Sequence, residues 1–181
     1  MTNDPTLDDP GTRLRTLGWT ATAGGAALRI RSAGTSETRF GRAWTRGGEW
    51  ESLPGEGAVY GLYAVEGTGT IEANGSESPY APHRLVLLDG GEPAIVRIQR
   101  PTALYLWRFE SGMLSAAPVR GRRGGREFPE TATAPFRALT NSLLEADPAV
   151  AESIYAARAS EYLLAAAFAG LDERRPRGSA A

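Results

Sequence analysis

The sequence predicts a mainly β protein, an antiparallel barrel or jelly roll followed by two α-helices. Between Tyr60 and Phe109, short apolar runs alternate with turn residues such as Gly67-Thr68-Gly69 and Asn74-Gly75. Asn-Gly between two extended runs is the strongest short-range hairpin signal, because both central residues of a type I′ turn need a positive φ. Several short strands at regular spacing favour a small barrel. After Thr133 the spacing of the apolar residues becomes helical.

Composition places the chain among ordinary globular proteins. Of its 181 residues, 41% are hydrophobic and 23% are charged, which suits one domain with its own core. The absence of cysteine excludes disulfides, iron–sulfur clusters and thiol catalysis, and a net charge of −1 gives no field to attract nucleic acid. We see neither an apolar run of the ~18 residues that a membrane helix needs nor a secretory signal, so we expect a cytoplasmic protein with no membrane partner.

The barrel is expected to span residues 26–130. Residues 1–25 are rich in Asp, Pro, Thr and Gly, and we interpret them as an N-terminal arm that docks on the barrel through Leu14, Leu17 and Trp19. Strands are expected at 26–32 and 39–45, ahead of the strands between Tyr60 and Phe109. The arginine- and glycine-rich segment 111–131 is interpreted as a solvated loop.

Two helices, at 134–146 and 148–170, are expected in a helical segment that covers residues 131–171. In the first, apolar residues recur at i, i+3, i+7 and i+8 from Phe136, the stripe of an amphipathic helix. Thr133 and Asp147 are the predicted N-caps, each with a proline in the turn that follows. The tail, residues 172–181, has the composition of a linker.

The order of these pieces resembles the N-terminal effector-binding and dimerisation domain of AraC-type transcription regulators. The matching residues are Glu66-Gly67-Thr68-Gly69, Pro82 to Leu88, Gly91-Glu92-Pro93 and Trp107-Arg108-Phe109. His83-Arg84 replaces the family's usual Gly-Asp, and Ala94 replaces its usual His. The resemblance implies a cupin-like antiparallel β-barrel (jelly roll) that binds a small organic effector, such as a sugar or an aromatic compound. It also implies that DNA is reached only through a helix-turn-helix part, which we expect to be absent from this chain.

Candidate ligand-binding residues lie on the last strand of the predicted barrel. Ala103, Tyr105, Trp107 and Phe109 share one face of that strand, and Leu104, Leu106 and Arg108 share the other. We expect Tyr105 and Trp107 to project into the barrel mouth and stack on the effector, the alternative being that they simply fill the core. The resemblance adds Glu66, the residue before Gly-x-Gly. Arg42 and Trp44, which share a face of the second strand, are further candidates.

The second helix carries a regular apolar seam. Residues on this seam recur at alternating spacings of four and three, as in a coiled coil: Val150, Ile154, Ala157, Glu161, Leu164 and Phe168. In AraC-type regulators the equivalent helix pairs with its own copy, so the resemblance implies that this seam is a homodimer interface. The alternative is that the seam packs only on the first helix and the barrel of its own chain.

The alternative function is that of a stand-alone cupin enzyme, a metal-dependent isomerase or dioxygenase. Such sites need two or three imidazoles and a carboxylate converging inside the barrel. His83 is the single histidine and is predicted to lie in a turn. We therefore predict no catalytic residue, no metal site and no cofactor, and expect the chain to bind a ligand without transforming it.

Overall fold

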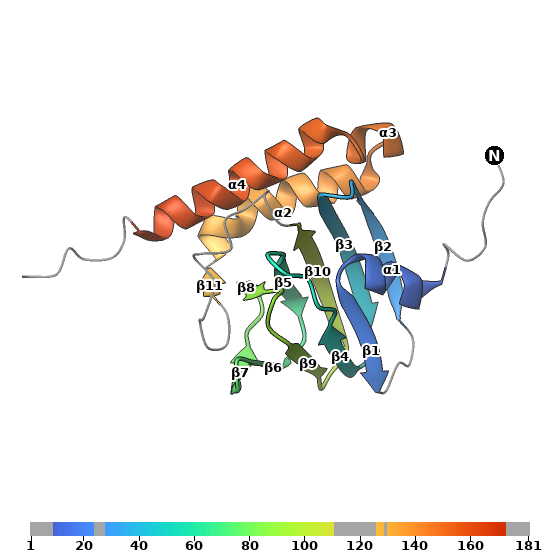
Figure 1. Ribbon diagram of the computed structural model, residues 1–181, viewed down its shortest axis with the longest axis vertical. Helices are drawn as coiled ribbons and strands as arrows, with labels where there is room; N and C mark the ends of the chain where they lie inside the picture. Colours follow the sequence, from blue (N-terminus) through green and yellow to red (C-terminus); the bar gives the residue numbers. More distant parts are fainter. Residues whose placement is uncertain (1–8, 24–27, 111–125, 129, 173–181) are drawn as a thin grey trace, which may run out of the picture.

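The chain folds into two antiparallel β-sheets that face each other, with helices along the outer side of the larger sheet (Figure 1). The computed structural model describes residues 9–23, 28–110, 126–128 and 130–172. This mainly β, cupin-like barrel with C-terminal helices is the fold class that the sequence predicted. The predicted tail lies outside the described residues, except for Asp172.

Eleven strands and four helices make up the described part of the chain. In spatial order, the five-stranded sheet consists of β1 (Trp19–Ala23), β4 (Gly48–Ser52), β9 (Ala94–Ile98), β6 (Gly69–Ala73) and β7 (Ser76–Tyr80). The six-stranded sheet consists of β11 (Arg126–Phe128), β8 (Leu85–Asp89), β5 (Val59–Glu66), β10 (Thr102–Phe109), β3 (Thr38–Thr45) and β2 (Arg29–Gly34). The helices are α1 (Pro10–Thr16), α2 (Glu130–Glu145), α3 (Pro148–Ala151) and α4 (Ile154–Asp172).

The β6–β7 hairpin forms at the predicted Asn-Gly turn. Asn74 and Gly75 have φ angles of 52° and 66°, the left-handed values that a type I′ turn requires at both central residues. Ala73 and Ser76 close the hairpin as paired residues. A local two-residue signal therefore sets the register of this edge of the five-stranded sheet.

The N-terminal segment packs on the barrel and also adds a strand to it. Asp9 caps α1, and the backbone N–H of Thr12, which donates to the Asp9 carboxylate at 2.9 Å, holds the pKa of Asp9 below its usual value. Leu14, Leu17 and Trp19 are completely buried, and β1 pairs with β4. The predicted arm therefore contributes α1 and a strand of the five-stranded sheet.

The helix boundaries differ from those predicted. Thr133 lies inside α2, with its hydroxyl donating to the Glu130 carbonyl, so it is not the N-cap. Asp147 does cap α3, accepting from the Ala149 N–H at 2.8 Å. The chain breaks after α3, and the Ser153 hydroxyl accepts from the Ala156 N–H at 3.2 Å to start α4. The predicted 148–170 helix is therefore two helices. None of the helices in the described ranges has the length and hydropathy of a membrane span.

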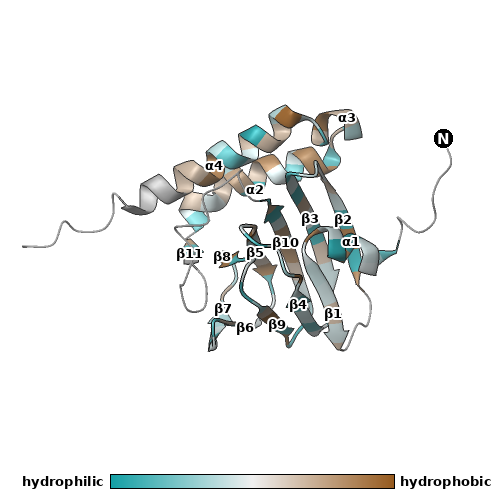
Figure 2. Ribbon diagram, in the orientation of Figure 1, coloured by the Kyte–Doolittle hydropathy of each residue, from teal (hydrophilic) through white to brown (hydrophobic). Residues whose placement is uncertain are grey.

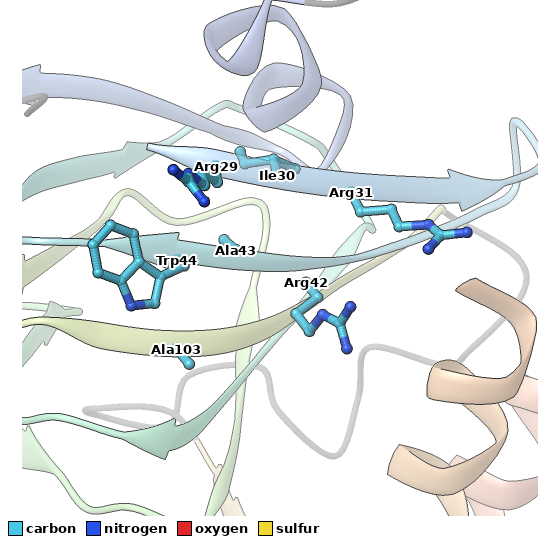
Figure 3. A pocket seen from close by; sticks show the side chains of 7 residues that line it. All are labelled: Arg29, Ile30, Arg31, Arg42, Ala43, Trp44 and Ala103. Carbon is cyan, nitrogen blue, oxygen red and sulfur yellow. The ribbon is translucent and has the colours of Figure 1, made fainter. Parts of the chain in front are cut away.

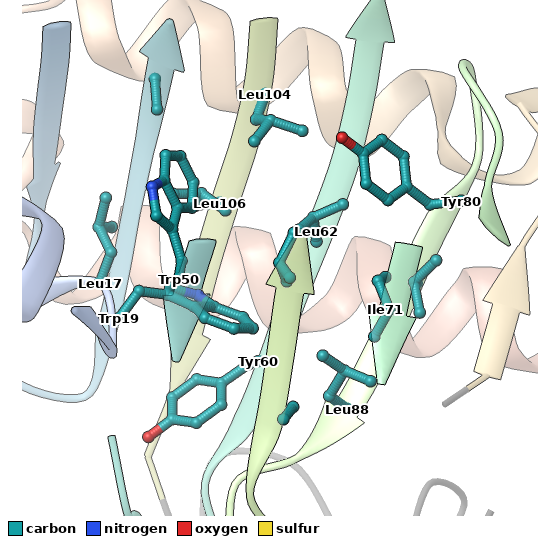
Figure 4. Packing of buried hydrophobic residues seen from close by; sticks show 14 of the residues in the cluster. Leu17, Trp19, Trp50, Tyr60, Leu62, Ile71, Tyr80, Leu88, Leu104 and Leu106 are labelled. Carbon is teal, nitrogen blue, oxygen red and sulfur yellow. The ribbon is translucent and has the colours of Figure 1, made fainter. Parts of the chain in front are cut away.

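The first hydrophobic core fills the space between the two sheets. Trp19, Trp50 and Tyr60, each at most 1% exposed, occupy this interior together with leucines from β5, β8 and β10 (Figure 4). The rings of Trp19 and Tyr60 lie 5.8 Å apart, and the Tyr60 hydroxyl donates to the Leu53 carbonyl at 2.6 Å. Burial raises the pKa of Tyr60 above its usual value. The inside of the barrel is thus a packed core built on bulky aromatic side chains.

A second core lies between the six-stranded sheet and the helices. Trp107 contacts Phe136 of α2 with ring centroids 4.7 Å apart, and its indole N–H donates to Thr140 at 2.8 Å. Tyr105 donates to Asn141 at 3.1 Å on the same face. Figure 2 shows hydrophobic segments on α2 and α4 and on the strands beneath them. The expectation that Tyr105 and Trp107 project into the barrel is wrong, because the leucines of β10 take the interior and its aromatic residues bind α2.

Trp107 is expected to act as a structural residue. Trp107→Phe removes the donor to Thr140 and leaves space under α2, so we expect the free energy of unfolding to fall by about 1–3 kcal/mol. Trp44→Phe is the matched control, because Trp44 is only half-buried, and its cost is expected to stay below about 1 kcal/mol. Urea denaturation followed by circular dichroism measures both. Equal losses for the two variants would contradict this assignment.

Candidate ligand-binding cleft

A cleft of about 360 Å³ lies on the outer face of the six-stranded sheet, at the edge formed by β2 and β3 (Figure 3). Its lining residues come from β2, β3 and β10: Arg29, Ile30, Arg31, Arg42, Ala43, Trp44 and Ala103. This edge of the sheet lies near the C-terminal end of α2, since Glu145 reaches Arg31 and Arg42. We refer to it as the arginine cleft.

Strand register brings the three arginines, Trp44 and Ala103 of the arginine cleft onto one face, while the side chains of Ile30 and Ala43 belong to the core on the other face. Trp44 of β3 lies opposite Arg29 of β2 on one side and opposite Ala103 of β10 on the other. Two residues earlier on β3, Arg42 lies opposite Arg31 of β2 on one side and opposite Tyr105 of β10 on the other. Because residues directly opposite one another in antiparallel strands share a face, the three arginines and the indole are neighbours.

Trp44 is the tryptophan that remains accessible. The other three tryptophans of the chain are at most 1% exposed, whereas Trp44 is half-buried. Its neighbour on β10 is the small Ala103, where the next outward residue of that strand is the bulky Tyr105. The indole is therefore held in the sheet but left open on the side of the cleft.

The charges of the arginine cleft are only partly neutralised. Arg31 forms an ion pair with Glu145 at 2.6 Å, and Arg42 forms a longer one with the same carboxylate at 3.4 Å. Arg42 also donates to the Asn141 side chain at 3.2 Å. Within the described part of the chain, the guanidinium of Arg29 has no ion pair or hydrogen bond. Three arginines and one glutamate leave a formal charge of +2 in the cleft.

Two of the sequence-predicted binding residues, Arg42 and Trp44, meet in this cleft. Tyr105 and Trp107 lie under α2 instead, and Glu66 is exposed at the end of β5, outside the cleft lining. Arg29 and Arg31 were not among the residues predicted from the sequence. Their signal was the Arg-x-Arg pattern in a predicted strand, since alternate residues of a strand share a face.

A polar cluster holds the first half of α2 on the sheet. Arg137 donates to the Tyr63 hydroxyl at 2.9 Å and lies over its ring, 5.3 Å from the centroid. His83 lies in a turn with a φ of 63°, its Nδ1 atom 3.3 Å from the same hydroxyl and 3.8 Å from Glu130. Burial raises the pKa of Tyr63, so its hydroxyl keeps its proton at neutral pH. This cluster is a structural clamp between β5 and α2.

A second cleft, of about 300 Å³, lies on the five-stranded sheet and is acidic. Glu51, Glu72 and Glu92 are among its lining residues. Glu72 is paired with Arg97 at 2.8 Å, and the same arginine also binds Glu49 and Glu77. Among the described residues, no three carboxylate or imidazole side chains converge as metal ligands would.

The predicted dimer seam is divided between buried and exposed positions. Ala157 and Leu164 are 2% and 0% exposed within the protomer, so the regular spacing partly reflects packing inside the chain. Val150 and Ile154 are about half exposed. Glu161 is paired with Arg158 of the same helix at 2.8 Å. The Phe168 side chain lies outside the described residues.

Two side chains that the seam did not include are the most exposed large apolar residues of the described helices. Tyr155 is 83% exposed and Tyr162 is 72% exposed. They are separated by seven residues, two helical turns, and so lie on one side of α4. The most exposed apolar positions of this helix are therefore one residue away from the predicted seam.

One solved structure supports this architecture, and two others match parts of the chain more weakly. In solved structures, the AraC-like transcriptional activator CuxR matches with a TM-score of 0.62 at 11% identity, over 93% of this chain and 69% of that chain. A cupin domain of an XRE-family transcriptional regulator from Enterobacter cloacae matches with a TM-score of 0.41 at 18% identity, over 46% of this chain and 96% of that chain. Ectoine synthase from P. lautus also matches with a TM-score of 0.41, at 19% identity, over 60% of this chain and 80% of that chain.

The family assignment follows from the sequence match. A search of curated individual proteins finds no match, so the assignment depends on the family profile. The sequence profile of the AraC-binding-like domain matches residues 11–170, from α1 almost to the end of α4. Because this match spans both sheets and the helices, the chain belongs to the AraC-binding-like domain family.

Proposed function

We propose that this chain is the small-molecule effector-binding and dimerisation domain of an AraC-type transcription regulator, and that it binds its effector in the arginine cleft. The observation that carries the proposal is the half-open indole of Trp44 beside three arginines. Family membership supports a regulatory ligand-binding role. A transcription regulator works where the DNA is, so the proposal places the chain in the cytoplasm.

The packing of the barrel supports a site on its outside. Large aromatic side chains occupy the space between the two sheets, and admitting an effector there would require them to move. The arginine cleft, at about 360 Å³, already has the size of a small-molecule pocket, for which about 300–1,000 Å³ is typical. Binding there needs no repacking of the core.

The chemistry of the lining residues supports binding rather than catalysis. Arginine keeps its charge throughout the physiological pH range, so it can orient an anion but cannot act as a general base. On the outer face, the other lining side chains are Ala103 and the indole of Trp44, which provides contact area and stacking. We therefore propose a sensor rather than a metal-dependent isomerase or dioxygenase.

A saturating effector is expected to stabilise the fold. At 100 times its dissociation constant, a ligand adds about 2.7 kcal/mol to the free energy of unfolding. We expect a thermal-shift screen of sugars, polyols, aliphatic acids and aromatic acids to give at least one saturable hit, and Trp44→Ala and Arg42→Gln to remove its shift. Arg100→Gln, at an exposed position outside the cleft, is the control and keeps the shift. A hit that persists in both cleft variants would place the effector elsewhere.

The exposed face of α3 and α4 is proposed as the homodimer contact. It consists of Val150, Ile154, Tyr155 and Tyr162, all of them large apolar side chains open to solvent in the protomer. A two-fold axis crossing this face would cover each set with its own copy. Arg158 and Glu161, which pair with each other at 2.8 Å, lie between the two tyrosines in the chain and give this stretch of α4 one charge of each sign.

Disrupting this face is expected to give monomers. Tyr155→Glu and Tyr162→Glu each add a charge at the proposed contact, where burial without a partner costs a few kcal/mol. Both side chains are exposed in the protomer, so the fold is expected to survive. Multi-angle light scattering should show a dimeric wild type and monomeric variants, while Gln99→Glu, an equal charge change on an exposed loop, stays dimeric. A monomeric wild type would end the proposal.

A further inference from the structure

We infer that the ligand of the arginine cleft is a planar aromatic carboxylate, and that its carboxylate competes with Glu145 for Arg31 and Arg42. This inference rests on the proposed function and specifies the ligand class and the response of the protein. Figure 3 shows the arrangement: Arg29 and Trp44 lie at one end of the cleft, and Arg31 and Arg42 extend toward a helix at the other end.

The ring requirement comes from Trp44. In the sheet register its indole has Arg29 on one side and the small Ala103 on the other, so a flat group can reach it from the Ala103 side without displacing a bulky neighbour. Aromatic rings gain from stacking on an indole beyond the area they bury, and a guanidinium at the rim adds a favourable contact with a ring. A saturated chain would gain only the apolar area.

The carboxylate requirement comes from the arginines. Arg31 and Arg42 lie directly opposite each other on paired strands, where like charges repel. Glu145 is shared between them, at 2.6 Å and 3.4 Å, and so supplies one negative charge for two positive ones. A guanidinium binds a carboxylate through two parallel N–H donors, which suits a ligand of this class.

Glu145 is a replaceable partner. Its side chain is 51% exposed and that of Arg31 is 49% exposed, so the ion pair is solvated and weak. A ligand carboxylate that also gains stacking on Trp44 can therefore take the place of the Glu145 carboxylate. Arg29, which has no side-chain partner among the described residues, is free to bind the same ligand without losing a contact.

Replacement of the Glu145 carboxylate by a ligand carboxylate would connect the cleft to the dimer face. Glu145 is the last residue of α2, and Asp147, two residues later, caps α3, which carries the exposed Val150. Releasing Glu145 removes the ion pairs that attach this helix end to β2 and β3. Coupling between two sites is reciprocal. A change at the dimer face that breaks the Glu145 ion pairs is therefore expected to strengthen ligand binding in the cleft.

The first experiment tests the ligand class. Isothermal titration of the full chain with benzoate, salicylate and 2-naphthoate is expected to give saturable binding that weakens as salt is raised, because the charges are solvent-screened. Benzyl alcohol and 2-naphthalenemethanol test the need for charge, octanoate tests the need for a ring, and inorganic phosphate tests for simple anion binding. Neutral alcohols, octanoate or phosphate binding as tightly as the aromatic acids would overturn the inference.

The second experiment tests the competition. Glu145→Gln keeps the shape of the side chain but removes its charge, and we expect it to tighten aromatic-acid binding about two- to five-fold, the range of an exposed ion pair. Glu152→Gln is the matched control: it removes one charge from an exposed position just after α3 and should leave the affinity unchanged. Arg29→Gln and Trp44→Leu should each weaken binding at least five-fold. Unaltered affinity in Glu145→Gln would overturn the competition.

The outcomes separate this inference from the proposed function. If a sugar or another neutral compound binds in a way that needs Trp44, the effector-binding function stands and the aromatic-carboxylate class is wrong. If no compound of the wider screen stabilises the chain, both are wrong. Arg29→Gln serves as the variant least able to disturb the fold, because Arg29 is exposed and its side chain has no ion pair or hydrogen bond within the described residues.

Discussion

The arrangement of this molecule depends on one constraint: the central strands of the six-stranded sheet are covered on both faces. The five-stranded sheet lies against one face, and α2 packs on the other through Trp107 and Phe136. Strands covered twice must be apolar on both sides, and accordingly β5 is buried at every position from Val59 to Ala64 and β8 from Leu85 to Leu88. By contrast, β7 alternates between buried or half-buried and exposed residues, as a strand with one face in solvent does.

The arginine cleft begins where α2 no longer covers the outer face of the six-stranded sheet. Along the outer face of β10 the side chains change from Trp107, under α2, through Tyr105, which still reaches Asn141, to Ala103, which lines the cleft. On β3 the same progression runs from buried Phe40 to Arg42 and then to Trp44. The polar contacts of Asn141 and Glu145 mark the border. The cleft is therefore a continuation of a core surface, and this explains why it combines an indole with charged residues.

The sequence identified what local interactions decide and missed what depends on partners distant in the chain. The Asn74-Gly75 turn and the Asp147 cap were predictable because a few neighbouring residues determine each. Alternation along β10 was also predictable, but with both faces apolar it could not tell which one holds Trp107. The helical spacing that includes Leu164 likewise identifies a packed face without identifying its partner. Arg29 was missed because its significance lies in the pairing of β2 with β3.

A site on the outer face also changes how an effector would act on the helices. A ligand inside a barrel reaches α2 only through the strands, whose cross-strand pairing resists deformation. A ligand in the arginine cleft would instead touch Arg31 and Arg42, whose side chains already contact the last residue of α2. Only Ala146 separates that residue from the cap of α3. In this arrangement the packed barrel serves as a rigid base, while the weak, solvated contacts at its edge are the ones a small molecule can exchange.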